Sequence, residues 1–217
     1  KRKGEIDIIS NVSNLTEWAT SYTHYLAGHT SLCVRKNVND YGDVYFCHAI
    51  ERTGVPTVQL RLISRKKESK GWNVETIDEG LFFDYEIIEC SINNESVIGI
   101  VYSDSLGKNT KFAYKKSDGW IYENITDEEG IGISLSKTQE GNPAAVFLKG
   151  GDLVLSYRNN NNEWISEKID GIPQDYYRND DRLHDIQKGA SISFSPSNIP
   201  YVAYSRSPGE GLIIASK

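Results

Sequence analysis

The sequence predicts an all-β fold built from four repeated antiparallel units, and three observations indicate it. Tryptophans at positions 18, 72, 120 and 164 are separated by 54, 48 and 44 residues, a period typical of stacked supersecondary units. Short alternating stretches rich in β-branched and aromatic residues run through the chain of 217 residues, as half-buried strands require. Gly, Asn, Asp and Ser separate these stretches, and helical periodicity is hard to find.

Each of the first three units is expected to hold four strands, the fourth headed by a tryptophan in a phrase such as Gly71-Trp72-Asn73-Val74-Glu75. The third unit is the clearest, because Gly141-Asn142-Pro143 and Lys149-Gly150-Gly151-Asp152 are strong turn sequences. The expected strands are 31–35, 44–50, 58–64 and 72–77 in the first unit, 85–90, 96–102, 111–114 and 120–125 in the second, and 131–136, 144–148, 153–157 and 164–169 in the third.

The last unit has only three expected strands, at 190–195, 201–205 and 212–216. A tryptophan strand at 18–22 stands alone at the other end of the chain. From Trp164 through both chain ends to Trp18 is 71 residues, and an insertion at 171–188 accounts for about 18 of them. The remaining 53 residues are close to the 54 residues that separate Trp18 from Trp72. The spacing therefore predicts one domain, 1–217, folded as a closed four-bladed β-propeller, which leaves only short, protected sheet edges. Its blades are expected at about 30–80, 84–128 and 130–170, and at 189–217 plus 15–25, where the N-terminal strand closes the last blade.

Several short motifs repeat between the units. Ser134-Leu135 followed by Gly141-Asn142-Pro143 is echoed by Ser193-Phe194 followed by Pro200-Tyr201, and Gly-Trp occurs at Gly71-Trp72 and Gly119-Trp120. In these residues the chain resembles β-propeller repeats of the lectin-like and sialidase-like type. The resemblance implies a propeller that serves as a lectin, a sialidase-like protein or an interaction domain. The segment Ser117-Asp118-Gly119-Trp120 is close to the sialidase Asp-box but lacks its spacing.

The repeated tryptophans have two interpretations. A tryptophan at the start of an outer strand is expected to pack between neighbouring blades, with its indole N–H donated to a carbonyl. The alternative is that the ring forms a platform on which a sugar stacks.

The charge balance excludes some classes of partner. The chain has 24 basic and 30 acidic residues, a net charge of −6 and a pI near 5.3, which disfavours nucleic acid and anionic membranes. No apolar run approaches the roughly 18 residues of a membrane span. The chain starts at Lys1 and contains no Met, so we expect a processed, trimmed or excised segment from which a leader could have been removed, and a secreted or cell-surface protein.

Cysteines and acids give weaker indications. Cys33 and Cys47 lie on neighbouring expected strands and could form a disulfide, whereas the alternative is that they are buried thiols, as is Cys90. No Cys or His cluster has the spacing of a metal site, and no phosphate-binding loop suggests a nucleotide cofactor.

Acids at 78–79 and 127–129 occupy equivalent places in successive units, where they either bind a structural cation or face solvent.

The most unusual segment is the insertion at 171–188. It contains the aromatic rings and planar hydrogen-bonding groups that a sugar or peptide site needs. The alternative is a solvated loop with local Arg–Asp pairs that contribute little. A second group follows the first tryptophan strand. The candidate ligand-binding residues are Tyr176, Tyr177, Arg178 and Asp181, followed by His24 and Tyr25.

These observations favour a non-catalytic module that recognises a glycan or glycoprotein through loops on one face. The first alternative is a small glycosidase or sialidase-like enzyme, and the second is a structural propeller that binds proteins. A glycosidase needs two carboxylates roughly 5–10 Å apart, and the abundance of acids here selects no pair. A sialidase-like site needs converging arginines, whereas we find no equivalent positions among Arg35, Arg52, Arg61, Arg158, Arg178 and Arg206.

Overall fold

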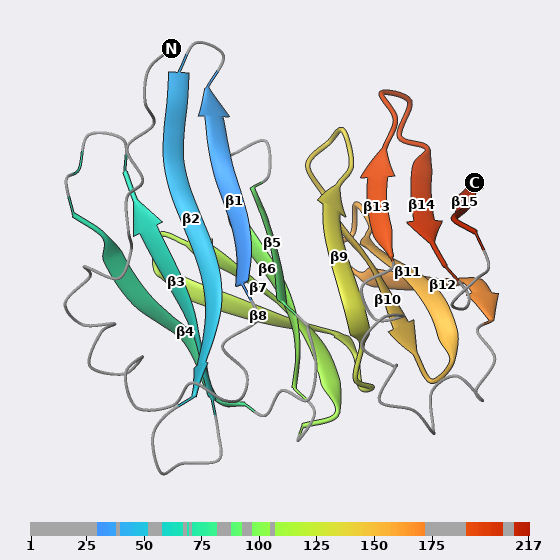
Figure 1. Ribbon diagram of the computed structural model, residues 1–217, viewed down its shortest axis with the longest axis horizontal. Helices are drawn as coiled ribbons and strands as arrows, with labels where there is room; N and C mark the ends of the chain where they lie inside the picture. Colours follow the sequence, from blue (N-terminus) through green and yellow to red (C-terminus); the bar gives the residue numbers. More distant parts are fainter. Residues whose placement is uncertain are drawn as a thin grey trace.

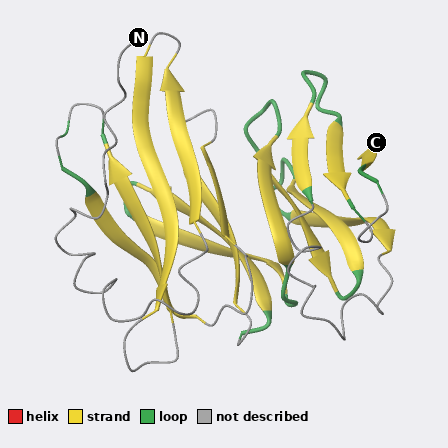
Figure 2. Ribbon diagram, viewed as in Figure 1, coloured by secondary structure: helices red, strands yellow, loops and turns green. Residues whose placement is uncertain are grey.

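A computed structural model describes most of the chain outside its N-terminal segment. Throughout these residues every regular element is a β-strand, so Figure 2 shows strands and loops but no helix. In the same residues no helix is long and apolar enough to cross a membrane. The described residues are 30–37, 40–51, 58–66, 69, 71–81, 88–92, 97–104, 107–171, 190–205 and 211–217.

The strands form four antiparallel sheets, and in each sheet the strands pair in chain order. The first sheet contains β1 (Thr30–Asn37), β2 (Asp40–Glu51), β3 (Val58–Arg65) and β4 (Asn73–Leu81), and the second contains β5 (Ile88–Ile92), β6 (Ile98–Asp104), β7 (Asn109–Lys116) and β8 (Gly119–Thr126). The third contains β9 (Ile131–Lys137), β10 (Pro143–Lys149), β11 (Asp152–Arg158) and β12 (Trp164–Gly171), and the fourth contains β13 (Ser191–Phe194), β14 (Pro200–Tyr204) and β15 (Ile213–Ser216).

The sheets follow one another across the molecule in sequence order, from the blue strands to the red ones (Figure 1). Their first strands are neighbours in series: β1 packs against β5, β5 against β9, and β9 against β13. Successive sheets therefore meet face to face along a common line of inner strands.

Each junction between sheets has its own apolar core. Leu60 and Leu62 of the first sheet pack with Ile100 and Tyr102 of the second. The other two cores lie between the second and third sheets and between the third and fourth. Burying such side chains contributes about 1.5–3 kcal/mol each, which makes these junctions the main stabilising contacts of the fold. The second junction contains Val101, Phe112, Leu135 and Phe147, and the third contains Val146, Leu155, Ile192 and Val202.

A buried polar network fixes the connection between β8 and β9. The Gly130 N–H donates to Ser103 Oγ at 3.0 Å and to Thr110 Oγ1 at 2.7 Å, and Ser103 Oγ donates back to the Gly130 carbonyl at 2.8 Å. A Cβ at Gly130 would lie 2.8 Å from Thr110 Oγ1 and 2.9 Å from the Phe147 ring. Only glycine therefore allows the connection to approach this closely.

A three-residue arrangement, which we call the clasp, joins the outer strands of neighbouring sheets. In the first clasp, Glu75 of β4 accepts hydrogen bonds from Trp120 Nε1 at 2.9 Å and from Lys115 Nζ. In the second, Glu123 of β8 accepts from Trp164 Nε1 at 2.9 Å and from Arg158 Nη2 at 2.8 Å. In both, the tryptophan and the cation are cross-strand partners.

The all-β prediction is confirmed, and every strand expected between 31 and 216 is present with its ends shifted by a few residues at most. Of the two alternatives for Cys47, the structure shows the buried thiol: the residue opposite it on β1 is Ser31, while Cys33 stands opposite Tyr45. One expectation about side chains needs correction. Trp120 and Trp164 do pack between sheets, but their indoles donate to carboxylates rather than to carbonyls.

The expected strand at 18–22 lies outside the described residues, so closure of the ring stays a prediction.

Candidate functional site

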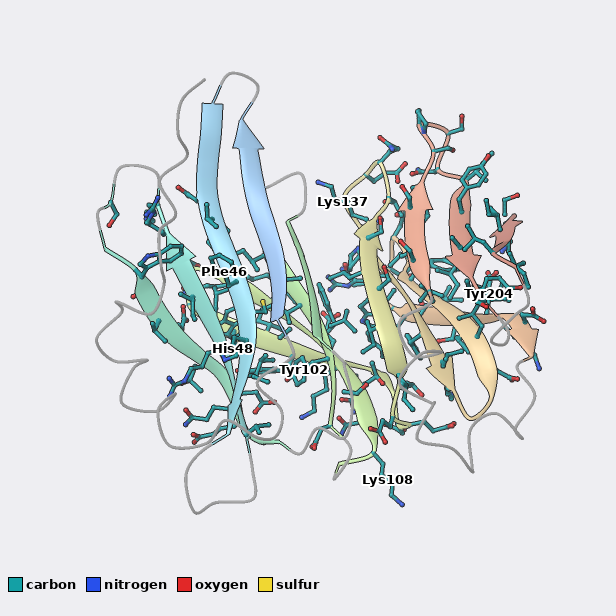
Figure 3. The ribbon with its side chains drawn as sticks, in the orientation of Figure 1. Phe46, His48, Tyr102, Lys108, Lys137 and Tyr204 are labelled. Atoms are coloured by element: carbon teal, nitrogen blue, oxygen red, sulfur yellow. The ribbon has the colours of Figure 1, made fainter. Side chains whose placement is uncertain are left out.

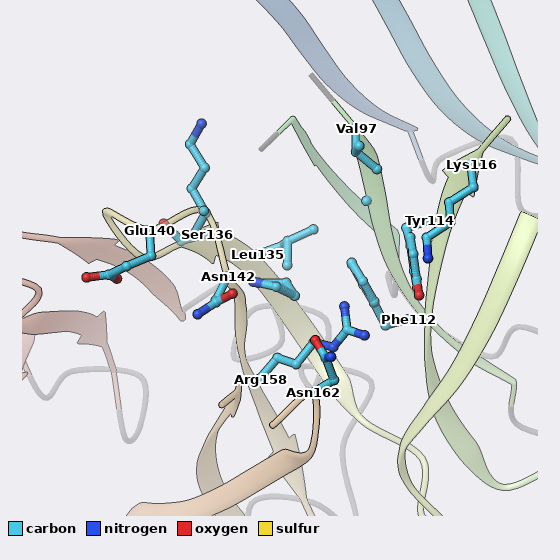
Figure 4. Close-up of a pocket in the computed structure, with 14 residues that line it drawn as sticks. Val97, Phe112, Tyr114, Lys116, Leu135, Ser136, Glu140, Asn142, Arg158 and Asn162 are labelled. Atoms are coloured by element: carbon cyan, nitrogen blue, oxygen red, sulfur yellow. The ribbon is translucent and has the colours of Figure 1, made fainter. Parts of the chain in front are cut away.

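A pocket of about 340 Å³ opens between the second and third sheets (Figure 4). One wall is the second half of β7, with Phe112, Tyr114 and Lys116 on one face of the strand. The opposite wall comes from the end of β9 and from two of the three hairpin turns of the third sheet, those between β9 and β10 and between β11 and β12. That wall contributes Leu135, Ser136, Lys137, Glu140, Asn142, Arg158 and Asn162.

The floor of the pocket depends on a close approach between β6 and β7. Phe112 is only 4% exposed, and its ring lies across Gly99, where a Cβ would come within 2.6 Å of the ring. Leu135 is 8% exposed and completes the apolar base. The floor is therefore apolar and closely packed, and the polar lining groups come from the walls.

The turn between β9 and β10 forms one rim. Its backbone closes through hydrogen bonds from Thr138 N to the Asn142 carbonyl at 2.9 Å and from Gly141 N to the Thr138 carbonyl at 3.0 Å. Gly141 has a φ of 91°, which glycine adopts without a steric penalty. The turn is also docked onto the fourth sheet, because Gln139 N donates to Asn198 Oδ1 at 2.6 Å. The rim is thus held by contacts to two sheets.

The turn between β11 and β12 forms the other rim, and its asparagines explain its shape. Asn159 Oδ1 accepts from the backbone N–H groups of Asn161 and Glu163, each at 2.9 Å, which is the Asx-turn arrangement. Asn162 has a φ of 64°, a left-handed conformation that asparagine tolerates. The Asn-rich run at 159–162 is therefore a turn that presents Asn162 to the pocket.

Arg158 occupies the centre of the pocket wall. Its guanidinium carbon lies 5.3 Å from the centroid of the Tyr114 ring, and its Nη2 donates to Glu123 in the second clasp. Its Nε is buried and has no hydrogen-bond partner within the described residues. Its place at the end of the third strand of its sheet matches that of Lys115 in the second sheet, so this position holds a cation in both sheets.

The aromatic pair of the pocket is already packed by protein groups. The rings of Phe112 and Tyr114 are stacked with centroids 5.5 Å apart, and Lys116 Nζ lies 5.6 Å from the Tyr114 centroid. A ligand would therefore meet the edge and the hydroxyl of Tyr114 more readily than an open ring face.

The lining carboxylate is turned toward the fourth sheet. Both oxygens of Glu140 lie 2.6 Å from Asn198 Nδ2, and the carboxylate extends away from Arg158 and Phe112 (Figure 4). Hydrogen bonds from its own backbone N–H, then from Thr138 and Asn198, lower the pKa of Glu140, so it stays ionised near neutral pH. The pocket is lined by three basic side chains, Lys116, Lys137 and Arg158, and one acidic one, Glu140, and Arg158 is ion-paired with Glu123.

The sequence prediction placed the site elsewhere. Tyr176, Tyr177, Arg178 and Asp181, together with His24 and Tyr25, lie outside the described residues. The connection from β12 to β13 leaves at Gly171, at the opposite end of the third sheet from the turns that line the pocket. The pocket was not predicted from the sequence because its walls come from separate segments, chiefly 112–116, 135–143 and 158–162. The one available signal was the run of alternating residues Phe112, Tyr114 and Lys116.

The acids that were considered for a cation site have structural partners. Asp78 Oδ2 accepts from the Tyr102 hydroxyl at 2.7 Å and lies 3.5 Å from Lys111 Nζ. Glu128 pairs with Lys149 at 3.0 Å. Within the described part of the chain no three His, Cys, Asp or Glu side chains are grouped as metal ligands.

No protein-family model matches the chain, and no curated protein sequence matches it. Among solved structures, the chain is similar to a thermostable family-43 glycoside hydrolase, with 14% identity and a TM-score of 0.47 over 90% of this chain and 72% of that one. It is similar to an exo-beta-1,3-galactanase from Phanerochaete chrysosporium, with 9% identity and a TM-score of 0.48 over 88% and 46% of the two chains.

A sialidase from Streptococcus pneumoniae is also similar, with 12% identity and a TM-score of 0.43 over 76% of this chain and 26% of that one. The chain spans well under two thirds of the galactanase and of the sialidase. At these identities and scores, the likeness assigns neither a family nor an activity to this protein.

Proposed function

We propose that this protein is a secreted or cell-surface recognition domain that binds a carbohydrate carrying an acidic group. Its scaffold would be a single four-bladed β-propeller, and its ligand would sit in the pocket between the second and third sheets. The observation that carries the proposal is the chemistry of the pocket walls, where the basic side chains Lys116, Lys137 and Arg158 outnumber the one acidic side chain, Glu140.

Three features support a sugar as the ligand. The volume of about 340 Å³ is that of a small-molecule site. Arg158, Asn142 and Asn162 supply planar groups that can donate to hydroxyls and carboxylates. The apolar floor of Phe112 and Leu135 suits the C–H face of a sugar ring.

The cationic walls support an acidic sugar over a neutral one. Lys116 is exposed at the mouth of the pocket, and the guanidinium of Arg158 lines its wall. Because Glu140 is held by Asn198, a bound carboxylate would meet little repulsion there. A charge-assisted hydrogen bond contributes about 1.5–3 kcal/mol, enough to select an acidic glycan over its neutral counterpart.

Hydrolysis is the second candidate function. Among the described lining residues Glu140 is the one carboxylate, whereas glycosidases act with two. Binding without turnover is therefore the function that the pocket favours. The residues of the 171–188 insertion remain a separate proposed binding site, because the insertion starts at Gly171, at the other end of the third sheet from this pocket.

The test is a glycan array that contains matched neutral and uronate-bearing oligosaccharides, followed by calorimetry on the best ligand. We expect acidic glycans to bind, and Lys116→Gln to weaken binding about tenfold, which corresponds to about 1.4 kcal/mol. Lys168→Gln is the matched control, because Lys168 is an exposed lysine of β12 paired with Asp152 at 2.7 Å and away from the pocket. It should leave the affinity unchanged.

Reducing ends released from the bound glycan are measured in the same samples. Turnover would replace the binding proposal with the glycosidase alternative. Equal binding of neutral and acidic glycans, or no effect of Lys116→Gln, would contradict the proposed ligand class.

A further inference from the structure

The third carboxylate of the clasp series has no tryptophan partner in the described part of the chain, whereas each of the first two accepts a hydrogen bond from one. Glu75, Glu123 and Glu167 each stand three residues after a tryptophan. Glu75 and Glu123 each accept from the tryptophan and from the cation of the next sheet. Glu167 accepts from Lys217 Nζ at 2.6 and 2.8 Å, and from the Tyr157 hydroxyl at 2.9 Å.

Lys217 occupies the cation position of the fourth sheet. It lies four residues after Ile213, which pairs with Tyr204, just as Lys115 lies four residues after Lys111, which pairs with Tyr102. The same register holds in the third sheet, where Arg158 lies four residues after Val154 and Val154 pairs with Phe147.

A second, independent contact aligns the junction of the third and fourth sheets with that of the first and second. Tyr102 donates to Asp78 at 2.7 Å, and Tyr204 donates to Asp170 at 2.6 Å. Both aspartates stand three residues after the clasp glutamate of their own strand. The junction of the third and fourth sheets therefore repeats that of the first and second, down to individual residues.

The fourth sheet differs because it has three strands in the described chain, in the order β13-β14-β15, where the other sheets have four. The edge beside β15 carries the most exposed large apolar side chains of these residues, Leu212 at 72% and Ile214 at 65%. The missing neighbour of β15 is the tryptophan-headed strand, which in the second and third sheets covers the equivalent strand.

The chain has four tryptophans, and Trp72, Trp120 and Trp164 are already placed. The remaining one, Trp18, stands 12 residues before the start of β1 at Thr30. Trp120 stands 11 residues before the start of β9 at Ile131. The chain after Trp18 is thus long enough to lead from an outer strand into the first strand of the next sheet.

We propose that the segment headed by Trp18 is the fourth strand of the last sheet, pairing along β15 with Trp18 opposite Lys217 and its indole N–H donated to Glu167. The edge is then covered by the chain's own N-terminal segment, and the first and fourth sheets are joined. This inference rests on the clasp geometry and is independent of the ligand.

The experiment uses the full chain labelled with ¹⁵N, whose four indole N–H resonances are assigned with single Trp→Phe variants. We expect Glu167→Gln to shift the Trp18 indole resonance and to leave the other three in place. Glu123→Gln is the matched control, and it should shift the Trp164 resonance while leaving that of Trp18 unchanged. Lys217→Met provides a second perturbation of the same site and should also shift the Trp18 resonance.

A Trp18 resonance that neither Glu167→Gln nor Lys217→Met moves, while the control behaves as expected, would overturn the proposal. Light scattering on the same samples distinguishes the chain's own strand from that of a second copy. A mass near 24.4 kDa is expected, and a dimer would overturn the intrachain form.

Discussion

A single residue position on the second strand of each sheet determines how that sheet meets the one before it. Tyr102 and Tyr204 occupy this position in the second and fourth sheets, and each donates its hydroxyl to an aspartate of the preceding sheet (Figure 3). In the third sheet the position is Phe147, and the residue six after the tryptophan is Thr126 rather than aspartate. Loss of the hydroxyl and loss of the carboxylate therefore occur together, which avoids a buried unpaired group.

The Tyr102 hydroxyl makes stability sensitive to alkaline pH. Burial, and then the hydrogen bond to Asp78, raise the pKa of Tyr102 above its ordinary value of 10.0. Because the folded state holds this proton more tightly, its contribution is complete below pH 10 and is lost as the pH rises further. We expect Tyr102→Phe to lower the free energy of unfolding by about 1 kcal/mol at neutral pH and to flatten its decline above pH 10.

Denaturant unfolding at pH 7 to 11 measures both effects. Tyr201→Phe is the control, because Tyr201 is 44% exposed on β14, and it should behave as the unmodified chain does. An identical alkaline decline in Tyr102→Phe and in the unmodified chain would contradict the role assigned to this hydroxyl.

At the scale of the element, the outer strands are joined by clasps in addition to apolar packing. The Arg158 and Glu123 side chains are 17% and 20% exposed, so their charges are partly shielded from water. The Lys168–Asp152 pair within the third sheet is 57% and 43% exposed. An exposed pair such as Lys168–Asp152 contributes little to stability. Removing one member of a partly shielded group such as Glu123, Arg158 and Trp164 leaves the remaining members without their hydrogen-bond partner.

We therefore expect Glu123→Ala to lower the free energy of unfolding by about 2 kcal/mol, since both Arg158 and the Trp164 indole lose their acceptor. Asp152→Ala should cost less than about 0.5 kcal/mol. Thermal and urea unfolding of the two variants check the difference, and equal losses would show that the clasp is no stronger than a surface ion pair.

Strands could be predicted from the sequence because a strand depends on local alternation and on its turn residues. Gly141, Asn162 and Asn198 all adopt positive φ in turns that the composition had indicated. The clasp could not be predicted in the same way, although the glutamate of the Gly-Trp-x-x-Glu phrase was visible. Its partners lie about 40 residues away, and which sheet packs against which is decided by the whole fold.

At the scale of the whole molecule, the sequence predicted the number and order of the strands better than the place of the site. The pocket arises where β7 faces two turns of the third sheet, and no continuous motif contains both walls. The insertion at 171–188 was predicted to hold the ligand-binding residues because it is long and rich in aromatic and charged residues. One wall of the pocket consists of ordinary turns, and the pocket forms only because these turns lie beside β7 of the second sheet.

The central claim is that an acidic glycan binds between the second and third sheets, and amide hydrogen exchange with and without that glycan tests it most directly. We predict that the bound glycan slows exchange in the two turns at 138–142 and 159–163 and in the adjoining half of β7. Protection confined to 22–29 and 172–189, with none in the two turns, would contradict this claim and would assign binding to those segments.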